Sequence, residues 1–236
     1  MKISASIFHL KRKAKSLSRE QDIPLHQALD QIATQEGCGS WSLLAARYSA
    51  LDKSGRLFAQ LKPGTLVLVG ARPGQGKTLL CFELVVEAMR AGQPSRIFSL
   101  EFTEPQCLEL FRGLGHEPGE YGRLFEFDGS DAICADHIVT KLASAPSGTL
   151  VVIDYLQLLD QRRDTPELSV QVQRLRAFAR EKGMTMIFIS QIDRHFDASK
   201  KPCPDLEDVR RPNPLDLRLF DKACFIHDGS MRYVKI

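Results

Sequence analysis

Long apolar runs are missing from this sequence of 236 residues: none approaches the ~18 residues that a membrane-spanning helix needs. The N-terminus also lacks an uninterrupted apolar stretch before its lysines, which argues against a secretory signal. Hydrophobic residues make up 43% of the chain and charged residues 26%, the composition of a soluble globular protein. We therefore expect a cytoplasmic protein with no membrane partner.

Paired cysteines are missing too. The chain contains no C-x-x-C pair, and most of its six cysteines lie among apolar neighbours. This pattern favours reduced thiols in a core over disulfides or a metal site. The six are Cys38, Cys81, Cys107, Cys134, Cys203 and Cys224.

The chain also has little excess charge of one sign. Its formal net charge is +3, which by itself does not indicate a nucleic-acid partner. The basic residues are concentrated at the start, where residues 1–60 carry nine Lys or Arg against five Asp or Glu. The stretch Lys11–Lys15 has the spacing of a basic helix face, which either lies along nucleic acid or is simply solvated. The solvated interpretation is the more ordinary one.

Residues 1–56 are predicted to form a small helical segment that ends in a linker. Apolar and basic residues mix from Ile3 to Leu17, and a second pattern with helical spacing follows Pro24. Ser40 is placed to cap a third helix. The sequence DKSG at 52–55 predicts the linker.

From residue 57 the pattern changes to short β-rich runs that alternate with longer helical stretches. Continuous apolar runs such as Leu150–Ile153 are typical of parallel strands that are buried on both faces. Asp228 and Gly229 are a signal for a two-residue hairpin. Residues 57–236 are therefore predicted to be an α/β domain, a mostly parallel sheet flanked by helices. The expected strands are 65–70, 96–101, 123–127, 149–154, 185–190 and 222–227, and the expected helices are 77–90, 104–114, 131–143 and 166–182.

A glycine-rich loop, GARPGQGKT at 70–78, joins the first of these strands to the first helix. This is the context that a phosphate-binding loop requires. Gly74 and Gly76 let the backbone curl so that several N–H groups point at phosphate oxygens. The following helix adds its positive end, and Lys77 can reach the β- and γ-phosphates. Thr78 can place its hydroxyl on Mg²⁺.

The strict form of the loop has glycine where this chain has alanine. That position comes at the end of the strand, before the curl, so we expect the methyl group to fit. A Gly- and Pro-rich turn without a ligand is the alternative, but Gly-Lys-Thr in this context favours a site for ATP and Mg²⁺. The expected binding residues are Ala71, Arg72, Pro73, Gly74, Gln75, Gly76, Lys77, Thr78 and Leu79.

Three further polar residues end predicted strands. Asp154 closes an apolar strand, as a carboxylate that holds Mg²⁺ does. Tyr155 follows it in place of an acid, so Glu101 at another strand end is the candidate for the carboxylate that activates water. Gln191 ends a third strand and can sense the γ-phosphate. Each also fits an ordinary polar strand end, but parallel strands end at one edge of a sheet, so we expect them to meet the loop there.

The chain resembles the ATPase domain of DnaB-type replicative helicases, which belong to the RecA-like group. The resemblance covers roughly residues 57–236, and the alanine at position 71 is itself usual in that family. It rests on segments in the family's order: GARPGQGKT (70–78), SLE (99–101), IDYLQL (153–158), SQIDR (190–194) and DLEDVR (205–210).

The resemblance implies a RecA-like fold, Mg-ATP binding and assembly of a ring of subunits around single-stranded DNA. It also implies Glu101 and Lys77 in catalysis, Asp154 at the metal and Gln191 as the γ-phosphate sensor. The family's N-terminal helical domain and linker helix are not recognisable in residues 1–56. Lys235 matches the lysine of the family's terminal Lys-x-Arg pair, whose arginine position falls beyond Ile236, so rapid hydrolysis is not implied.

Two loops carry the basic residues that we predict for DNA. In the family, the strand ends at which they lie face the ring channel, and Lys or Arg there would bind phosphates independently of sequence. Ordinary solvated loops are an equal alternative, and Phe196 alone offers no stacking platform. The residues are Arg162, Arg163, Arg194, Lys200 and Lys201.

Two other functions remain open. A P-loop kinase for a small molecule would need an Arg-rich lid and an acceptor pocket, and the IDYLQL and SQIDR segments argue against it. A regulator with weak or no turnover would bind ATP and use residues 1–50 to hold a protein partner. The sequence favours the DnaB-like ATPase over both.

Overall fold

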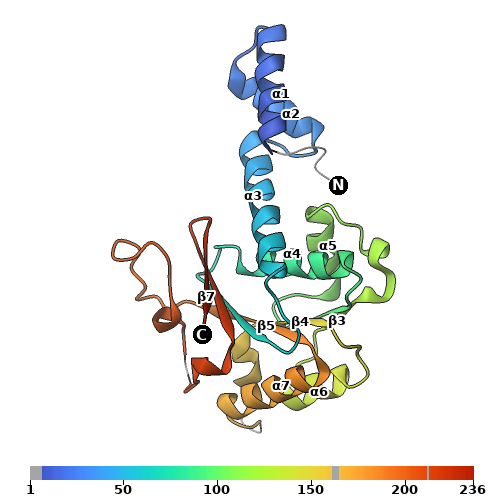
Figure 1. The fold of residues 1–236 in the computed structure, drawn as a ribbon, viewed down its shortest axis with the longest axis vertical. Helices are drawn as coiled ribbons and strands as arrows, with labels where there is room; N and C mark the ends of the chain where they lie inside the picture. Colours follow the sequence, from blue (N-terminus) through green and yellow to red (C-terminus); the bar gives the residue numbers. More distant parts are fainter. Residues whose placement is uncertain (1–6, 161–164, 212) are drawn as a thin grey trace.

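The computed structural model describes residues 7–160, 165–211 and 213–236. No helix among these residues is long and apolar enough to cross a membrane. Helices α1 (Ile7–Glu20) and α2 (Leu25–Gln35) lie at one end of the long axis in Figure 1, and α3 (Trp41–Phe58) runs from them to α4 (Lys77–Arg90) beside the sheet.

The three N-terminal helices form where the sequence predicts helices. Ser40 caps α3, because its Oγ accepts a hydrogen bond from the Leu43 N–H at 3.3 Å. Asp30 on α2 accepts a hydrogen bond from the Trp41 N–H at 2.8 Å, which fixes α2 against the start of α3. Apolar residues of all three helices pack into a cluster of their own, formed by Leu10, Ala14, Ala28, Ile32, Ala33, Cys38 and Leu44.

The predicted linker at 52–55 is wrong, because these residues lie inside α3, which continues to Phe58. Gly55 inside a helix costs about 1 kcal/mol relative to alanine. Leu57, in the last turn of the helix, is 1% exposed in the apolar cluster that includes α4, and burying a leucine contributes roughly 2 kcal/mol. Tertiary burial therefore outweighs the local preference for a break.

Seven strands of the described residues form one sheet in the order β3-β2-β4-β5-β1-β6-β7. Neighbouring strands are parallel except β6 and β7, which form an antiparallel hairpin. Asp228 and Gly229 make its turn with φ of 48° and 72°, as the Asp-Gly signal predicts. The strands are β1 (Leu66–Ala71), β2 (Ser95–Ser99), β3 (Phe125–Asp128), β4 (Leu150–Asp154), β5 (Thr185–Gln191), β6 (Lys222–His227) and β7 (Ser230–Lys235).

Helices cover both faces of the sheet (Figure 1). Along β1, Leu66 and Leu68 belong to the core cluster with α6 and α7, whereas Val67 and Val69 belong to the cluster with α4 and α5. This double burial explains the continuous apolar runs and confirms the predicted α/β fold. The helices are α4 (Lys77–Arg90), α5 (Glu104–Gly113), α6 (Ala135–Leu142) and α7 (Leu168–Lys182), with short 3-10 helices η1 (Pro118–Leu124), η2 (Leu156–Asp160), η3 (Leu206–Asp208) and η4 (Leu217–Leu219).

All six cysteines are free thiols, and five of them are buried. The exception is Cys134, which is partly exposed. Burial raises the pKa of Cys107 and of Cys224 to about 12, so these thiols are unreactive at neutral pH. The burial of these five cysteines agrees with the expected place of most of them in an apolar core.

Candidate active site

The phosphate loop leaves the sheet after Ala71 and enters α4 at Lys77. Gly74 and Gly76 have φ of 77° and 84°, a left-handed conformation that is strained for residues with a side chain. A Cβ on either glycine would meet no atom within 4 Å, so backbone conformation rather than crowding requires glycine here. The loop has the curled path that lets backbone N–H groups surround a phosphate.

Position 71 lies in the strand rather than in the curl. Ala71 is fully buried and pairs with Gln191 on β5 and with Ile226 on β6. Glycine is needed one residue earlier, because a Cβ on Gly70 would lie 2.9 Å from the ring of Phe225. The alanine that departs from the strict motif is therefore an ordinary buried strand residue.

Asp154, the last residue of β4, is 3% exposed and lies beside the start of α4. Burial, with a smaller contribution from the charge of Glu101, raises the pKa of its carboxyl to about 6. The nearby Lys77 ammonium and a hydrogen bond with Thr78 act on this pKa in the opposite direction. The Oδ2 atom of Asp154 has no hydrogen-bond partner among the described residues. The loop and the strand-end carboxylate are thus brought together as predicted.

The raised pKa of Asp154 predicts how the stability of the protein without metal depends on pH. The folded-state pKa of Asp154 is about 6, above the ordinary value of 3.8. The protonated carboxyl therefore stabilises the folded protein fully below pH 3.8, and this contribution is lost as the pH rises through 6. Asp154→Asn removes the titration. In EDTA, we expect the unfolding free energy of wild type to fall by about 2 kcal/mol relative to the variant between pH 4 and pH 8. Urea denaturation at both pH values measures this, and parallel pH dependences would contradict it.

Glu101 lies two residues beyond the end of β2, at the same edge of the sheet. Ser99, the last residue of β2, pairs with Asp154 in the ladder between β2 and β4. The Ser99 Oγ accepts a hydrogen bond from the Glu101 N–H at 3.0 Å, which fixes the backbone there. The Glu101 side chain is exposed and close enough to Asp154 to raise the pKa of that carboxyl. Two carboxylates therefore lie at the same edge of the sheet as the loop.

Gln191, at the end of β5, is held by a segment whose contacts the sequence did not predict. The Arg210 Nη1 donates to the Gln191 Oε1 at 3.1 Å, and the Arg210 N–H donates to the Gln191 carbonyl at 2.9 Å. Gln157 Nε2 in turn donates to the Arg210 carbonyl at 3.0 Å. An isolated bridge between Ile192 and Val209 continues the pairing. Arg210 thus fixes the amide of Gln191, and Gln157 holds Arg210 in place. In the sequence, only the IDYLQL and DLEDVR segments that contain Gln157 and Arg210 could have pointed to these contacts.

Two loop residues brace the loop against its neighbours. Arg72 donates through Nη2 to the carbonyls of Arg194 and Phe196, at 2.7 and 2.8 Å, and its guanidinium lies 5.6 Å from the centre of the Phe196 ring. The Gln75 Oε1 accepts a hydrogen bond from the Asp228 N–H at 2.7 Å. The loop is therefore tied on one side to the segment after β5 and on the other to the β6–β7 turn.

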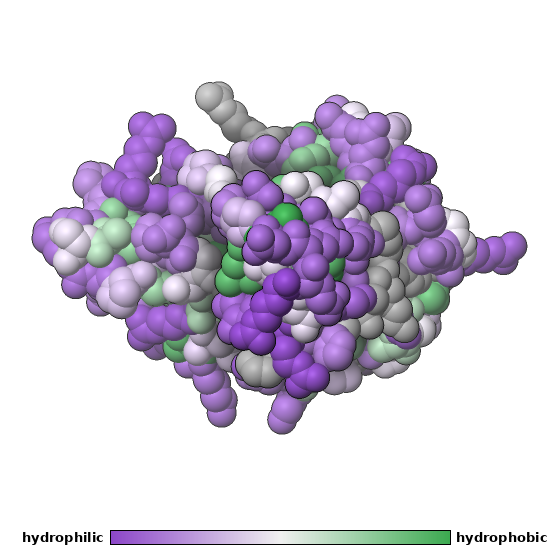
Figure 2. Space-filling model, turned by 90° about the horizontal axis from the view of Figure 1, so that it is seen from above, coloured by the Kyte–Doolittle hydropathy of each residue, from purple (hydrophilic) through white to green (hydrophobic). Residues whose placement is uncertain are grey.

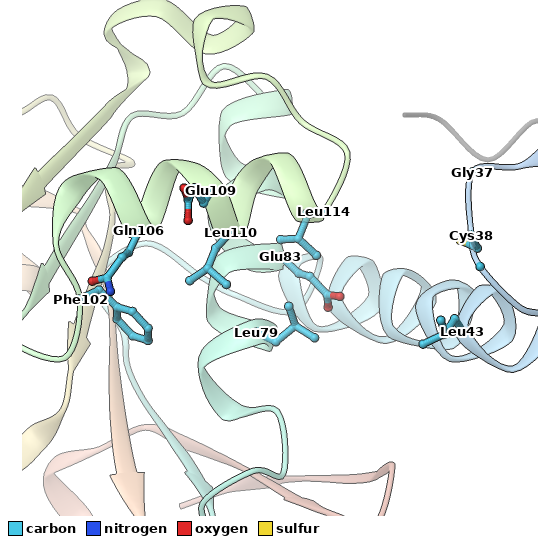
Figure 3. Close-up of a pocket in the computed structure, with 12 residues that line it drawn as sticks. Gly37, Cys38, Leu43, Leu79, Glu83, Phe102, Gln106, Glu109, Leu110 and Leu114 are labelled. Carbon is cyan, nitrogen blue, oxygen red and sulfur yellow. The ribbon is translucent and has the colours of Figure 1, made fainter. Parts of the chain in front are cut away.

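Leu79 was predicted to bind the nucleotide, but its side chain lies away from the phosphate loop. It lines an apolar groove of about 800 Å³ between α4, α5 and the turn from α2 to α3. Figure 3 shows it with Leu110 and Leu114, and with Leu43 of α3 across the groove. The side chain of Leu79 thus faces this groove, and only its backbone belongs to the first turn after the loop.

The two lysines predicted to contact DNA lie close to carboxylates. Lys201 lies 2.9 Å from Asp205 and 2.6 Å from Asp208, and these two carboxylates raise its pKa. Lys200 lies 3.7 Å from Asp197. Paired in this way, both lysines attract phosphate less than free cations do.

The other residues considered for DNA binding are the arginines Arg194, Arg162 and Arg163, and the aromatic Phe196. Arg194 is exposed, and its backbone carbonyl accepts a hydrogen bond from Arg72. Phe196 is 4% exposed and its ring lies beneath the Arg72 guanidinium, so a base cannot stack on it. Arg162 and Arg163 lie outside the described residues.

The sequence was compared with protein families and with known proteins. Residues 131–223 match the family described as "DnaB-like helicase C terminal domain". The chain is 26% identical over 241 residues to the replicative DNA helicase DnaB of Mycoplasma genitalium, covering 84% of this chain and 51% of that protein. This chain is similar to the ATPase domain of DnaB-type helicases. It is 30% identical to DnaB of Nostoc sp. over 181 residues, which cover 64% of this chain and 21% of that protein. It thus spans about half, or less, of the length of these relatives.

Solved structures share the fold. One of them, an isolated ATPase domain, has a TM-score of 0.59 at 20% identity, and the match covers 75% of this chain and 74% of that domain. A DnaB-like replicative helicase, solved in a study of its interactions with primase, also has a TM-score of 0.59, at 18% identity. That match covers 92% of this chain and 66% of the helicase. The predicted RecA-like fold is confirmed.

Proposed function

We propose that this chain is an ATPase of the DnaB-helicase type that binds Mg-ATP at the loop 71–79 and acts on single-stranded DNA. The carboxylate of Asp154 is the observation that carries the proposal. It is buried, one of its oxygens has no hydrogen-bond partner among the described residues, and Thr78 and Lys77 lie beside it. A buried polar atom without a partner is costly, and a metal–nucleotide complex supplies the missing partner.

The residues at this edge fit Mg²⁺. This ion prefers oxygen ligands, keeps several waters and is usually held by one or two protein groups together with substrate phosphates. The Thr78 hydroxyl and the Asp154 carboxylate are such groups. Among the described residues no cluster of three or more His, Cys, Asp or Glu exists that would suit a different metal. When bound, Mg²⁺ supplies positive charge next to the transferred phosphoryl group.

Each polar residue at this edge has a distinct role in the proposal. Lys77 neutralises charge on the β- and γ-phosphates. Glu101 accepts a proton from the attacking water, since it is an exposed carboxylate next to the metal-binding one. Gln191 contacts the γ-phosphate through its amide, whose orientation Arg210 fixes. The segment 205–211 therefore responds to whether that phosphate is present.

Single-stranded DNA as partner and assembly into a ring come to this chain from its similarity to replicative helicases. Exposed Arg194 lies close to the loop, because its carbonyl accepts a hydrogen bond from the Arg72 guanidinium. Phosphate contacts there would couple the nucleotide site to the strand.

The deciding experiment is the ATPase rate of the full chain, with and without single-stranded DNA, over a range of protein concentrations. We expect phosphate release that rises with DNA and rises more than linearly with protein concentration. Transfer of phosphate to a small molecule would favour the kinase. ATP binding without turnover, from a protein that stays monomeric with DNA, would favour the regulator.

Arg210→Ala tests the fixing of Gln191. We expect kcat to fall about tenfold, because the loss of one positioned hydrogen bond costs roughly 1–1.5 kcal/mol, while KM for ATP stays within about twofold. The matched control is Arg211→Ala, which removes an exposed arginine at the next position. Thermal melting of both variants separates positioning from unfolding. Equal kcat for the two variants would contradict the assignment.

A further inference from the structure

Helix α1 exposes a row of cations. Lys11, Lys15 and Arg19 follow one another at intervals of four residues, about 6 Å apart along the helix axis. At roughly 100° per residue, Arg12 lies beside them, so that all four fall within one arc of about 100°. All four are exposed. Lys13 is exposed too but lies on the other side of the helix, outside the row.

The row differs from the basic loops near the sheet in its surroundings. Among the described residues, none of its four side chains is in an ion pair or a hydrogen bond. The loop lysines Lys200 and Lys201, by contrast, are each paired with at least one aspartate. Within the described part of the chain, the row on α1 therefore offers more available positive charge than these lysines at the sheet edge do.

The helix that carries the row is packed against its neighbours. Leu10 and Ala14 bury the opposite side of α1 in the small N-terminal cluster, and the Ser18 hydroxyl donates to the Ile23 carbonyl at 2.7 Å where α1 turns into α2. Helices α1 and α2 stand away from the sheet at the end of α3 (Figure 1). Seen from above in Figure 2, this end of the molecule is mostly hydrophilic. The cations are therefore accessible, and the helix sets their spacing.

We infer that the row formed by Lys11, Arg12, Lys15 and Arg19 binds the phosphate backbone of a nucleic acid. Regularly spaced, exposed cations match a polymer with regularly spaced anions, and the release of counterions drives such binding. Contacts of this kind position a strand without reading its bases. This contact lies outside the ATP site and needs no nucleotide.

The salt dependence of binding by the full chain tests the inference. The probes are a fluorescent single-stranded oligonucleotide of mixed sequence and the duplex of the same sequence, measured by anisotropy from low to high salt. In a variant with Lys11→Gln, Lys15→Gln and Arg19→Gln, we expect the slope of log K against log salt to flatten by about 2 for the single strand or nearly 3 for the duplex. A slope change that reaches the expected value for only one of the two probes identifies the form that α1 binds.

A single pair of variants on the same helix controls for total charge. Lys15→Glu is expected to weaken binding at low salt several-fold more than Lys13→Glu, which changes the charge equally but outside the row. Equal weakening by both, or an unchanged slope in the triple variant, overturns the inference. Loss of binding to vesicles that contain phosphatidylserine, with DNA binding intact, overturns it in favour of a membrane surface.

The outcome is independent of the ATPase proposal. The basal ATPase rate without DNA is expected to be unchanged in the triple variant, because the row on α1 is separate from the nucleotide site. If wild type hydrolyses no ATP, the ATPase proposal fails and the salt slopes still report on α1. Circular dichroism confirms that the variant helices are folded, so that a loss of binding reflects charge alone.

Discussion

Lys77→Ala is expected to lower the ATP hydrolysis rate at least about 100-fold and to weaken ATP binding. The ammonium provides positive charge that the phosphates need, and removal of one preorganised stabilising group costs about 100- to 1,000-fold in turnover. Loss of its charge also raises the pKa of Asp154 further, because Lys77 is the strongest group opposing the effect of burial on that carboxyl. Metal binding should therefore weaken at neutral pH. Phosphate release and fluorescent-nucleotide titration measure the two effects.

The control for this variant is Lys141→Ala, which removes an exposed lysine on α6 whose ion-pair distance to Asp128 is 3.6 Å. It should leave both quantities close to wild type. Wild-type binding and turnover in Lys77→Ala would remove the loop from the proposed site. Normal binding with lost turnover would restrict the role of Lys77 to the transition state.

Glu101→Gln is the second variant with a large expected effect. We expect kcat to fall about 100- to 10,000-fold, the contribution of a positioned general base, with ATP binding retained. The substitution also removes the negative charge that raises the pKa of Asp154. Binding of Mg-ATP at pH 6 should accordingly be as tight as in wild type or tighter. Single-turnover hydrolysis and equilibrium binding at pH 6 and pH 8 measure both.

Glu104→Gln is the matched control, since it neutralises an exposed glutamate three residues further along, at the start of α5. Its turnover should equal that of wild type. If Glu101→Gln keeps its turnover, the water-activating group lies elsewhere. If its binding at pH 6 weakens instead, the proposed electrostatic link between Glu101 and Asp154 is wrong.

Much of the fold was predictable because its signals are local. Apolar runs marked the strands β4 and β5, and α4 begins and ends at the predicted residues 77 and 90. The placement of Asp154 and Gln191 at one edge followed from the rule that parallel strands end together. Residues at the carboxyl ends of parallel strands could therefore be placed from the sequence alone.

What the sequence did not predict depends on contacts between distant residues. Arg210 meets Gln191 across 19 positions and Gln157 across 53, and no local pattern encodes either contact. The pairing of Lys201 with Asp208 depends on how the turn after β5 folds, and the sequence alone did not show that this lysine has an acidic partner. The continuity of α3 depends on the burial of Leu57, which only the packed structure shows.

Helix α3 is continuous and connects α4 to the N-terminal helices α1 and α2. Its 18 residues span about 27 Å, and one end packs on α4, whose first residue is the loop lysine Lys77. A tilt of α4 by about 10° would carry the far end of a rigid helix of that length by roughly 5 Å. Such a tilt would displace α1 and α2, at the opposite end of the molecule from the sheet, further than it displaces α4 itself.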